Sequence, residues 1–173
     1  MTTLFTADHH FSHDAIIDMA RRPFSTVEEM DEHMIASWNE VVDPRDTVWH
    51  LGDFAHRCDP KRKRIIFGKL NGNKQLIVGN HHEADTRKLG WGSVSEFKEI
   101  TVEGQKIVLF HYAMRTWPGV NRGALHFYGH SHGRLPGNAF CTDVGVDCFD
   151  FRPVALPEIR TVLERDPALG VKP

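Results

Sequence analysis

The chain has 173 residues, of which 40% are hydrophobic and 25% are charged, and its formal net charge is -2. This composition is ordinary for a globular protein, and no apolar run approaches the roughly 20 residues that a membrane span needs. The first residues, MTTLFTADHH, carry neither the basic region nor the apolar stretch of a signal peptide, and three cysteines are too few for a disulfide framework. We therefore expect a cytoplasmic protein with one domain over residues 1–173 and no membrane partner.

The first half of the chain alternates predicted strands with predicted helices. The run STVEEMDEHMIASWNEVV, residues 25–42, is the clearest helix, because Ser25 and Glu28 have the spacing of a capping box and apolar residues recur at steps of three and four. Short apolar runs with strand character precede and follow it. In chain order we predict a strand at 3–7, helices at 14–21 and 25–42, a strand at 47–51, a helix at 60–70 and a strand at 75–78.

The second half is predicted to be mainly strands. The run ITVEGQKIVLF indicates a hairpin with Glu103 and Gly104 as its turn. Strands separated by helices are typical of βαβ units, whereas these later strands follow one another closely. We therefore expect an α/β fold with two packed mixed β-sheets flanked by helices. The predicted elements of this half are strands at 97–102, 106–110, 125–129 and 142–146 and a helix at 157–165, which begins with Pro157.

Twelve histidines are the unusual feature of the composition, and most of them cluster after predicted strands. Ligands bind beyond the carboxyl ends of strands in open α/β sheets, because neighbouring strand ends converge on one crevice. Five strand ends could therefore bring seven metal-ligating side chains to one place. Each fragment alone is common by chance, but five in this order are not. The fragments are Asp8-His9-His10, Gly52-Asp53, Gly79-Asn80-His81, His111 and Gly129-His130-Ser131-His132.

Together, these fragments resemble the motifs of the calcineurin-like metallophosphoesterase superfamily, in its small single-domain bacterial-type form. The family pattern is D-x-H, G-D, G-N-H-D/E, a lone His and G-H-x-H. Here it reads DHH, GD, GNHH, H and GHSH over residues 8–132. The resemblance implies a sandwich with four layers in the order α/β/β/α. One position departs from the pattern, because the acidic residue that usually closes the third motif is His82.

The resemblance also implies roles for individual residues. His81 matches the residue that acts on the substrate without binding a metal, so it is the expected catalytic group. The ligands of two divalent metal ions match seven positions: Asp8, His10 and His132 for one ion, Asn80, His111 and His130 for the other, and Asp53 for both.

Hydrolysis of a phosphate ester explains why such groups are needed. Two divalent ions about 3.5–4 Å apart can hold a phosphoryl group, and they need a shared anion such as Asp53. In the expected reaction a hydroxide that bridges the ions attacks phosphorus in line with the leaving group, and His81 protonates the leaving oxygen. Nitrogen and oxygen ligands exclude a cysteine-rich zinc site and disfavour magnesium and calcium. We expect manganese, with iron, zinc, nickel and cobalt as alternatives.

The substrate is expected to be a phosphodiester, because the chain is short and has no obvious insertion to enclose a small monoester. A phosphomonoesterase or a nucleotide pyrophosphatase is the alternative. From another class, a non-catalytic binding module on the same fold would be expected to lose ligands or the proton donor. A nuclease would need a continuous basic track, which the net charge of -2 does not indicate. Nucleotides and nucleic acids stay open as partners, and the sequence predicts no oligomeric state.

Four further residues are candidates for binding the substrate: His13, His56, Arg115 and Arg122. The two arginines lie in MRTWPGVNR, directly after His111, where Trp117 could also stack against a base or ring.

Other polar residues near the motifs are expected to be structural. His50 lies inside a predicted strand and should be a core histidine, and the basic run PKRKR at 60–64 should be a solvated helix face. Glu83 or Asp85 could take the place of the carboxylate that is missing at His82 and orient His81.

Overall fold

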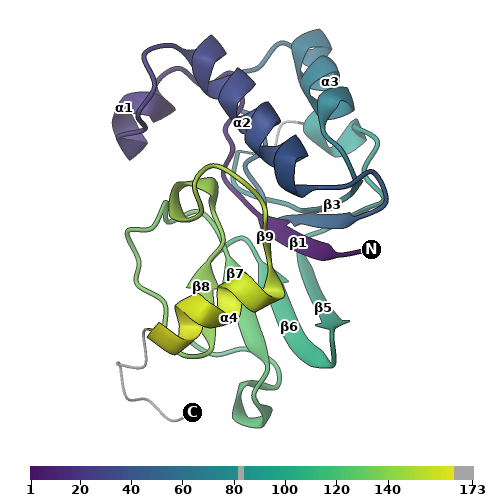
Figure 1. The fold of residues 1–173 in the computed structure, drawn as a ribbon, viewed down its shortest axis with the longest axis vertical. Coiled ribbons are helices and arrows are strands. Elements are labelled where there is room, and N and C mark those ends of the chain that lie inside the picture. Colours follow the sequence, from purple (N-terminus) through teal and green to yellow (C-terminus); the bar gives the residue numbers. More distant parts are fainter. Residues whose placement is uncertain (82–83, 166–173) are drawn as a thin grey trace.

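The computed structural model describes residues 1–81 and 84–165, and two mixed β-sheets that share a hydrophobic core form its centre (Figure 1). The first sheet has the strand order β4-β3-β2-β1-β9, and the second has the order β5-β6-β7-β8. The strands are β1 Thr3–Thr6, β2 Thr47–His50, β3 Asn73–Ile77, β4 Ser93–Ser95, β5 Phe97–Val102, β6 Gln105–Phe110, β7 Leu125–Tyr128, β8 Cys141–Asp143 and β9 Val154–Ala155. The helices are α1 Ile16–Ala20, α2 Val27–Val41, α3 Pro60–Lys69 and α4 Leu156–Arg165, with 3-10 turns η1 Thr86–Lys88, η2 Val120–Arg122 and η3 Val146–Cys148.

Parallel pairing dominates the part of each sheet that leads to the histidine motifs. In the first sheet β1, β2, β3 and β4 run parallel, and only β9 is antiparallel to its neighbour β1. In the second sheet β6, β7 and β8 run parallel, and β5 pairs antiparallel with β6. The turn between β5 and β6 is the predicted one, and both Glu103 and Gly104 have positive φ, as a tight hairpin of this type requires.

Large apolar side chains from both sheets fill the space between them. Phe5 of β1 and Phe127 of β7 are fully buried, and their rings meet edge to face with centres 4.9 Å apart. Ile77 of β3 and Leu109 of β6 are also fully buried in this core. Such interdigitation fixes the two sheets relative to each other, and with them the ends of their strands.

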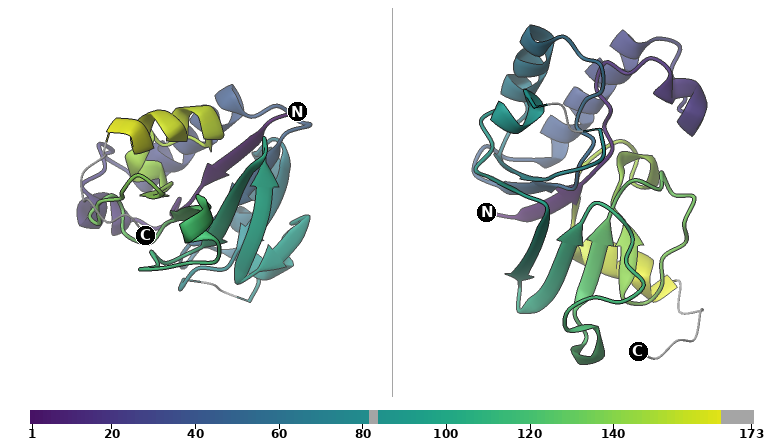
Figure 2. Two further views of the ribbon diagram at one scale, coloured as in Figure 1. Left: turned by 90° about the horizontal axis from the view of Figure 1, so that it is seen from below. Right: turned by 180° about the vertical axis from the view of Figure 1, so that it is seen from behind.

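Helices α1 to α3 cover the outer face of the first sheet, as the two views of Figure 2 also show. Met30, Met34 and Trp38 of α2 are fully buried there against the sheet. The predicted capping box is displaced by one residue: the Thr26 hydroxyl accepts a hydrogen bond from the Glu29 N–H at 3.2 Å. Two consecutive hydroxyl residues are followed by two consecutive glutamates here, so the spacing alone fits either pair.

The outer face of the second sheet is covered by residues 112–124, a segment that includes η2. Trp117 is buried in this layer, packs with Val108 and Tyr128, and donates its indole N–H to the Ala124 carbonyl at 2.8 Å. Helix α4 instead lies beside the edge strands β8 and β9 and adds Leu156 and Ile159 to the core between the sheets. The expected fold of two mixed sheets flanked by helices is confirmed.

All seven predicted strands and four predicted helices are present, with ends that differ by up to three residues. The short edge strands β4 and β9 were not predicted, because β4 has a single apolar residue and β9 is only two residues long. Among the described residues, no helix is long and apolar enough to cross a membrane.

Candidate metal centre

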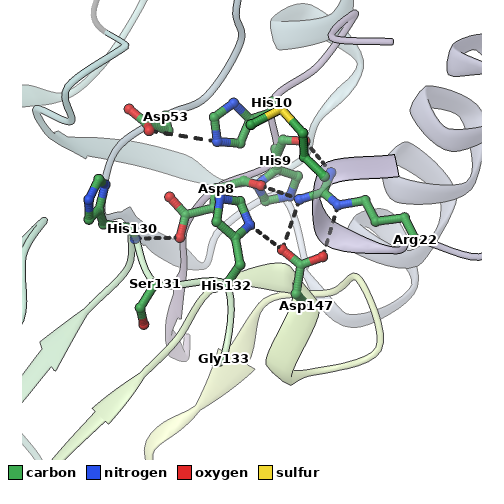
Figure 3. Close-up of polar contacts among 12 residues, drawn as sticks. Asp8, His9, His10, Arg22, Asp53, His130, Ser131, His132, Gly133 and Asp147 are labelled. Atoms are coloured by element: carbon green, nitrogen blue, oxygen red, sulfur yellow. Dashed lines mark hydrogen bonds and ion pairs between the residues drawn. The ribbon is translucent and has the colours of Figure 1, made fainter. Parts of the chain in front are cut away.

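The predicted ligands gather where the carboxyl ends of strands from both sheets meet, and Figure 3 shows Asp8, His10, Asp53, His130 and His132 among them. Asp8 and His10 follow β1, Asp53 follows β2, and Asn80 follows β3. From the second sheet, His111 follows β6, and the pair His130 and His132 follows β7. The structure therefore brings together all seven residues that the strand-end pattern and the family resemblance indicated.

The seven residues form two groups. Asp8, His10 and His132 have ligand atoms within 4.8 Å of one another, and so have Asp53, His111 and His130. Asn80 belongs with the second group, because its side-chain oxygen lies 2.8 Å from His111 Nε2 and 2.8 Å from His130 Nδ1.

Asp53 lies between the two groups. Its Oδ2 atom is 3.6 Å from His10 Nε2 in the first group and 3.5 Å from His111 Nε2 in the second. Its other oxygen accepts a hydrogen bond from the His81 backbone N–H at 2.9 Å. One carboxylate thus faces both groups and also positions the start of the loop that carries His81.

Lone pairs converge in the second group. His111 Nδ1 lies 2.6 Å from the Leu51 carbonyl oxygen, which can only accept, so this nitrogen carries the hydrogen. In the neutral imidazole Nε2 then offers a lone pair, and it faces the oxygen atoms of Asn80 and Asp53. A cation between these atoms would relieve the repulsion among them, so the donor set fits a metal ion.

Buried polar atoms without partners indicate a metal ion in the first group as well. Asp8 Oδ1 and both ring nitrogens of His10 are buried and lack a hydrogen-bond partner among the described residues. Buried polar atoms without partners are costly, and a metal ion would satisfy them. His132 Nδ1 lies 2.7 Å from the Asp147 carboxylate, so its Nε2 is the nitrogen that stays available as a ligand.

Backbone strain also concentrates on these residues. A left-handed backbone costs a residue other than glycine about 1 kcal/mol or more, so it persists where the surrounding structure enforces it. The proposed ligands with this conformation are Asp8 (φ 60°), His10 (φ 51°), Asp53 (φ 56°), His130 (φ 67°) and His132 (φ 48°).

The carboxyl groups of Asp8, Asp53 and Asp143 lie close together in the centre. Burial raises the pKa of Asp8 well above its usual value, and the nearby carboxylates of Asp143 and Asp53 add to this effect. Burial would also raise the pKa of Asp53, but the adjacent His111 imidazole and the hydrogen bond from the His81 N–H lower it below the usual range. Carboxyl groups thus crowd a site in which burial lowers the pKa of both His10 and His130 and so disfavours their charged forms. Divalent cations would offset the repulsion among these carboxylates.

Sequence reasoning missed the residues that hold the ligands in place. Arg22 donates to the backbone carbonyls of Asp8 at 2.6 Å and His9 at 2.8 Å, and its guanidinium pairs with both Asp147 oxygens at 2.9 Å (Figure 3). Asp147 in turn binds His132, so one buried arginine connects the first and last motifs. Arg22 belongs to no recognisable sequence motif, so its role becomes clear only from its hydrogen bonds in the structure.

Asp143 holds the loop of the last motif. Its Oδ2 atom accepts from the Ser131 hydroxyl at 2.6 Å and from the Gly133 N–H at 3.0 Å. Asp143 is the last residue of β8, so the strand-end rule that found the other motifs also covers this strand and could have found it.

His81 lies beside the first group, as expected for a residue that acts on a substrate there. Its ring centre is 5.4 Å from that of His10 and 4.4 Å from that of His56. His13 lies on the same side, with its ring 4.6 Å from His56. Two of the four predicted substrate residues therefore border the site.

The expected orientation of His81 by Asp85 is wrong. Both Asp85 oxygens contact the Lys63 ammonium, at 2.9 and 3.0 Å, and Lys63 is fully buried, so this part of PKRKR is not a solvated face. His82 and Glu83 lie outside the described residues. The described neighbour of the His81 ring on this side is the imidazole of His56.

The two predicted arginines do not join the site. Arg122 ends η2 just before β7 begins, whereas His130 follows the other end of that strand. Arg115 is exposed on the segment that covers the outer face of the second sheet. Trp117 is buried in that layer and cannot stack against a ligand. The two arginines were predicted to lie at the site because they follow His111 in the sequence. The prediction is wrong because the chain turns away from the site directly after His111.

No protein-family model matches the chain. The uncharacterized protein MJ1445 of Methanocaldococcus jannaschii is 32% identical over 167 residues, which cover 92% of this chain and 89% of the relative. The protein of unknown function AQ665 from Aquifex aeolicus has a similar structure, with a TM-score of 0.72, 24% identity, and coverage of 93% of this chain and 98% of that chain. This likeness shows the fold alone. A novel archaeal phosphodiesterase aligns with a TM-score of 0.48 and 16% identity over 84% of this chain and 82% of its own, which is too low to carry an argument.

Proposed function

The chain belongs to the family of protein MJ1445, and from the geometry of its candidate metal centre we propose that it is a metal-dependent hydrolase of phosphate esters. The observation that carries the proposal is Asp53, whose Oδ2 atom faces a histidine of each ligand group at 3.5 to 3.6 Å while His81 stands beside them. Hydrolysis of a phosphate ester needs two cations held close together by a shared anion, and a proton donor beside them for the leaving oxygen.

The seven ligands would hold two divalent ions, with Asp53 shared. When bound, these ions would supply positive charge for the phosphoryl oxygens and for the attacking water. The donors are imidazole nitrogens and carboxylate and amide oxygens, and they favour manganese over magnesium or calcium.

His81 would donate the proton to the leaving oxygen. Its backbone is fixed by Asp53, and its ring lies between His10 and His56. His13 is less suited to this step, because burial and the neighbouring imidazoles of His56 and His81 lower its pKa to about 4. A neutral His13 can instead donate a hydrogen bond from its ring N–H to a substrate oxygen.

Phosphodiesters are the favoured substrates. Asn80 and His130 of the second group are exposed, so the centre opens to solvent rather than into a closed pocket. An open site can accept an ester with organic groups on both sides of phosphorus, whereas a small monoester gains more from enclosure.

The test is hydrolysis by manganese-loaded protein of bis(p-nitrophenyl) phosphate, p-nitrophenyl phosphate and a dinucleotide. We expect the diesters to be cleaved, chelation to abolish the activity and manganese to restore it better than magnesium. Preference for the monoester would identify a phosphomonoesterase. Metal binding without hydrolysis of any ester would identify a binding module and contradict the proposal.

Substitution of His81 tests its role in the same assay. Loss of a general acid costs about 10²–10⁴-fold, and the cost falls on esters whose leaving group needs the proton. His81→Ala should therefore lose this much on the dinucleotide and little on the nitrophenyl diester. His33→Ala, which removes an exposed imidazole on α2, should change neither rate. Equal losses on both substrates would show that His81 is not the acid.

A further inference from the structure

A cavity of about 500 Å³ opens beside the candidate metal centre. Its lining residues are Met19, Ala20, Arg21, His132 and Arg134. His132 is a proposed ligand of the first metal, so a molecule bound at the centre can extend into this cavity. The His132 ring stacks on the ring of His10, another proposed ligand, with centres 5.3 Å apart.

Two arginines from different parts of the chain line this cavity. Arg21 ends α1, with its backbone in the left-handed region and its N–H bonded to the helix carbonyl of Asp18. Arg134 follows the last motif, and its guanidinium donates to the Met19 carbonyl at 2.8 Å. This bond ties the two walls of the cavity together and keeps the Arg134 guanidinium at its edge.

These two arginines differ from Arg22, which directly follows Arg21 in the sequence. Arg22 is buried and its charge is matched by Asp147. Within residues 1–81 and 84–165, neither Arg21 nor Arg134 has a carboxylate partner, and both are exposed. Their positive charge is therefore available to a ligand.

The chemistry of the cavity selects an anion. A guanidinium binds phosphate through paired N–H donors, with a geometry that a lysine cannot match. The carboxylates of the centre itself would repel a substrate anion until metals are bound, so positive charge at the rim also helps to attract one.

We propose that the substrate carries a second phosphate group, bound by Arg21 and Arg134, beside the phosphodiester that is hydrolysed. This rests on the proposed phosphoesterase function and narrows its substrate class to phosphodiesters that carry a further phosphate group. The second phosphate occupies the cavity next to His132 while the scissile phosphate lies at the metals.

Two chromogenic substrates that differ only in this group test the proposal: the p-nitrophenyl ester of thymidine 5′-phosphate and the same ester with a 3′-phosphate. With manganese-loaded protein, the 3′-phosphate should raise kcat/KM at least about tenfold, as charge-assisted bonds to one phosphate allow. In Arg21→Met and Arg134→Met this ratio should fall toward one. The control Arg64→Met, which removes an exposed arginine on α3, should leave the ratio unchanged. A ratio near one in the wild type overturns the proposal.

Binding to the metal-free protein separates this proposal from the hydrolase function. By calorimetry, thymidine 3′-phosphate should bind at least about tenfold more tightly than thymidine, and the preference should disappear in the Arg21→Met, Arg134→Met double variant. If neither ester is hydrolysed but this preference is present, the hydrolase function fails and the phosphate site stands. Equal affinities, or a preference that survives the double variant, contradict the phosphate site.

Discussion

The histidines of this protein have different roles, and the role of each depends on the groups that its ring contacts. His9 and His50 are both fully buried, and His9 Nδ1 lies 3.0 Å from His50 Nε2. His50 is thus the core histidine that its place in a strand predicted. His10, one position from His9, instead has both ring nitrogens without a partner among the described residues and joins the metal centre. The sequence shows where histidines cluster but not which neighbour faces which way.

Asp147 is predicted to set the metal affinity of the first group. Its carboxylate fixes the ring of His132 and is itself fixed by Arg22. Asp147→Asn should weaken binding at this position by about 10- to 100-fold, as outer partners of metal-ligating histidines commonly do when they are changed. Manganese titration followed by electron paramagnetic resonance measures this directly, because the signal of a coupled metal pair should give way to that of isolated ions.

Asp31→Asn is the matched control for that variant. Asp31 is buried and pairs with Arg62 at 2.7 Å, but its hydrogen bonds reach Ser12 rather than a proposed ligand. The control should lower stability without changing metal affinity. If both variants bind manganese equally well, Asp147 has only a structural role.

At the scale of elements, apolar periodicity was sufficient for most of the fold. It located α2 because one face had to be buried, and it located β1 to β3 because each is a short apolar run. Spacing could not choose between Thr26 and Ser25 as the cap, since both offer a hydroxyl. It also could not place residues 112–124, because spacing does not show that this connection between β6 and β7 folds back over the outer face of the second sheet.

The approach of β7 to β1 depends on Gly129. A Cβ atom at this position would lie 2.6 Å from the Ala7 Cβ and 2.7 Å from Asp8 Oδ2, closer than atoms can pack. Gly129→Ala should therefore push the two strand ends apart, cost about 1–3 kcal/mol of stability and weaken metal binding. Urea unfolding and manganese titration of the variant measure the two effects.

Gly68→Ala provides the comparison. Gly68 lies in α3, and a Cβ there meets nothing within 4 Å. This substitution should stabilise the protein by up to about 1 kcal/mol and leave metal binding unchanged. A Gly129→Ala protein that is as stable as the wild type would show that the strand ends can separate without cost.

At the scale of the whole molecule, both sheets contribute ligands to the candidate metal centre, and neither sheet could form it alone. Asp8, Asp53 and Asn80 come from the first sheet, and His111 and His130 from the second. The order of the motifs and the strand-end rule were enough to predict this convergence. The network around Arg22 and the cavity beside His132 could not be predicted, because they depend on how α1 and the loop after β7 pack together.

Acid should destabilise the metal-free protein through its buried histidines. Burial lowers the pKa of His50 to about 3, whereas an unfolded histidine titrates near 6.5. The stabilisation is therefore complete above pH about 6.5 and is lost as the pH falls toward 3, at about 1.4 kcal/mol per pH unit for one such histidine. Urea unfolding between pH 7 and pH 5 measures the slope, and His50→Gln should reduce it by about one proton. An unchanged slope would mean that His50 is not held neutral in the folded protein.

The most direct test of the dimetal account is the metal content of wild-type and Asp53→Asn protein after manganese loading and gel filtration, measured with the rate of bis(p-nitrophenyl) phosphate hydrolysis. Asp53 faces both ligand groups, so its loss should affect both metal positions. We predict two ions per wild-type chain, activity that appears as they bind, and loss of both ions and activity in the variant. Two tightly bound ions per chain in Asp53→Asn, or full hydrolysis by wild-type protein that contains no metal, would contradict the account.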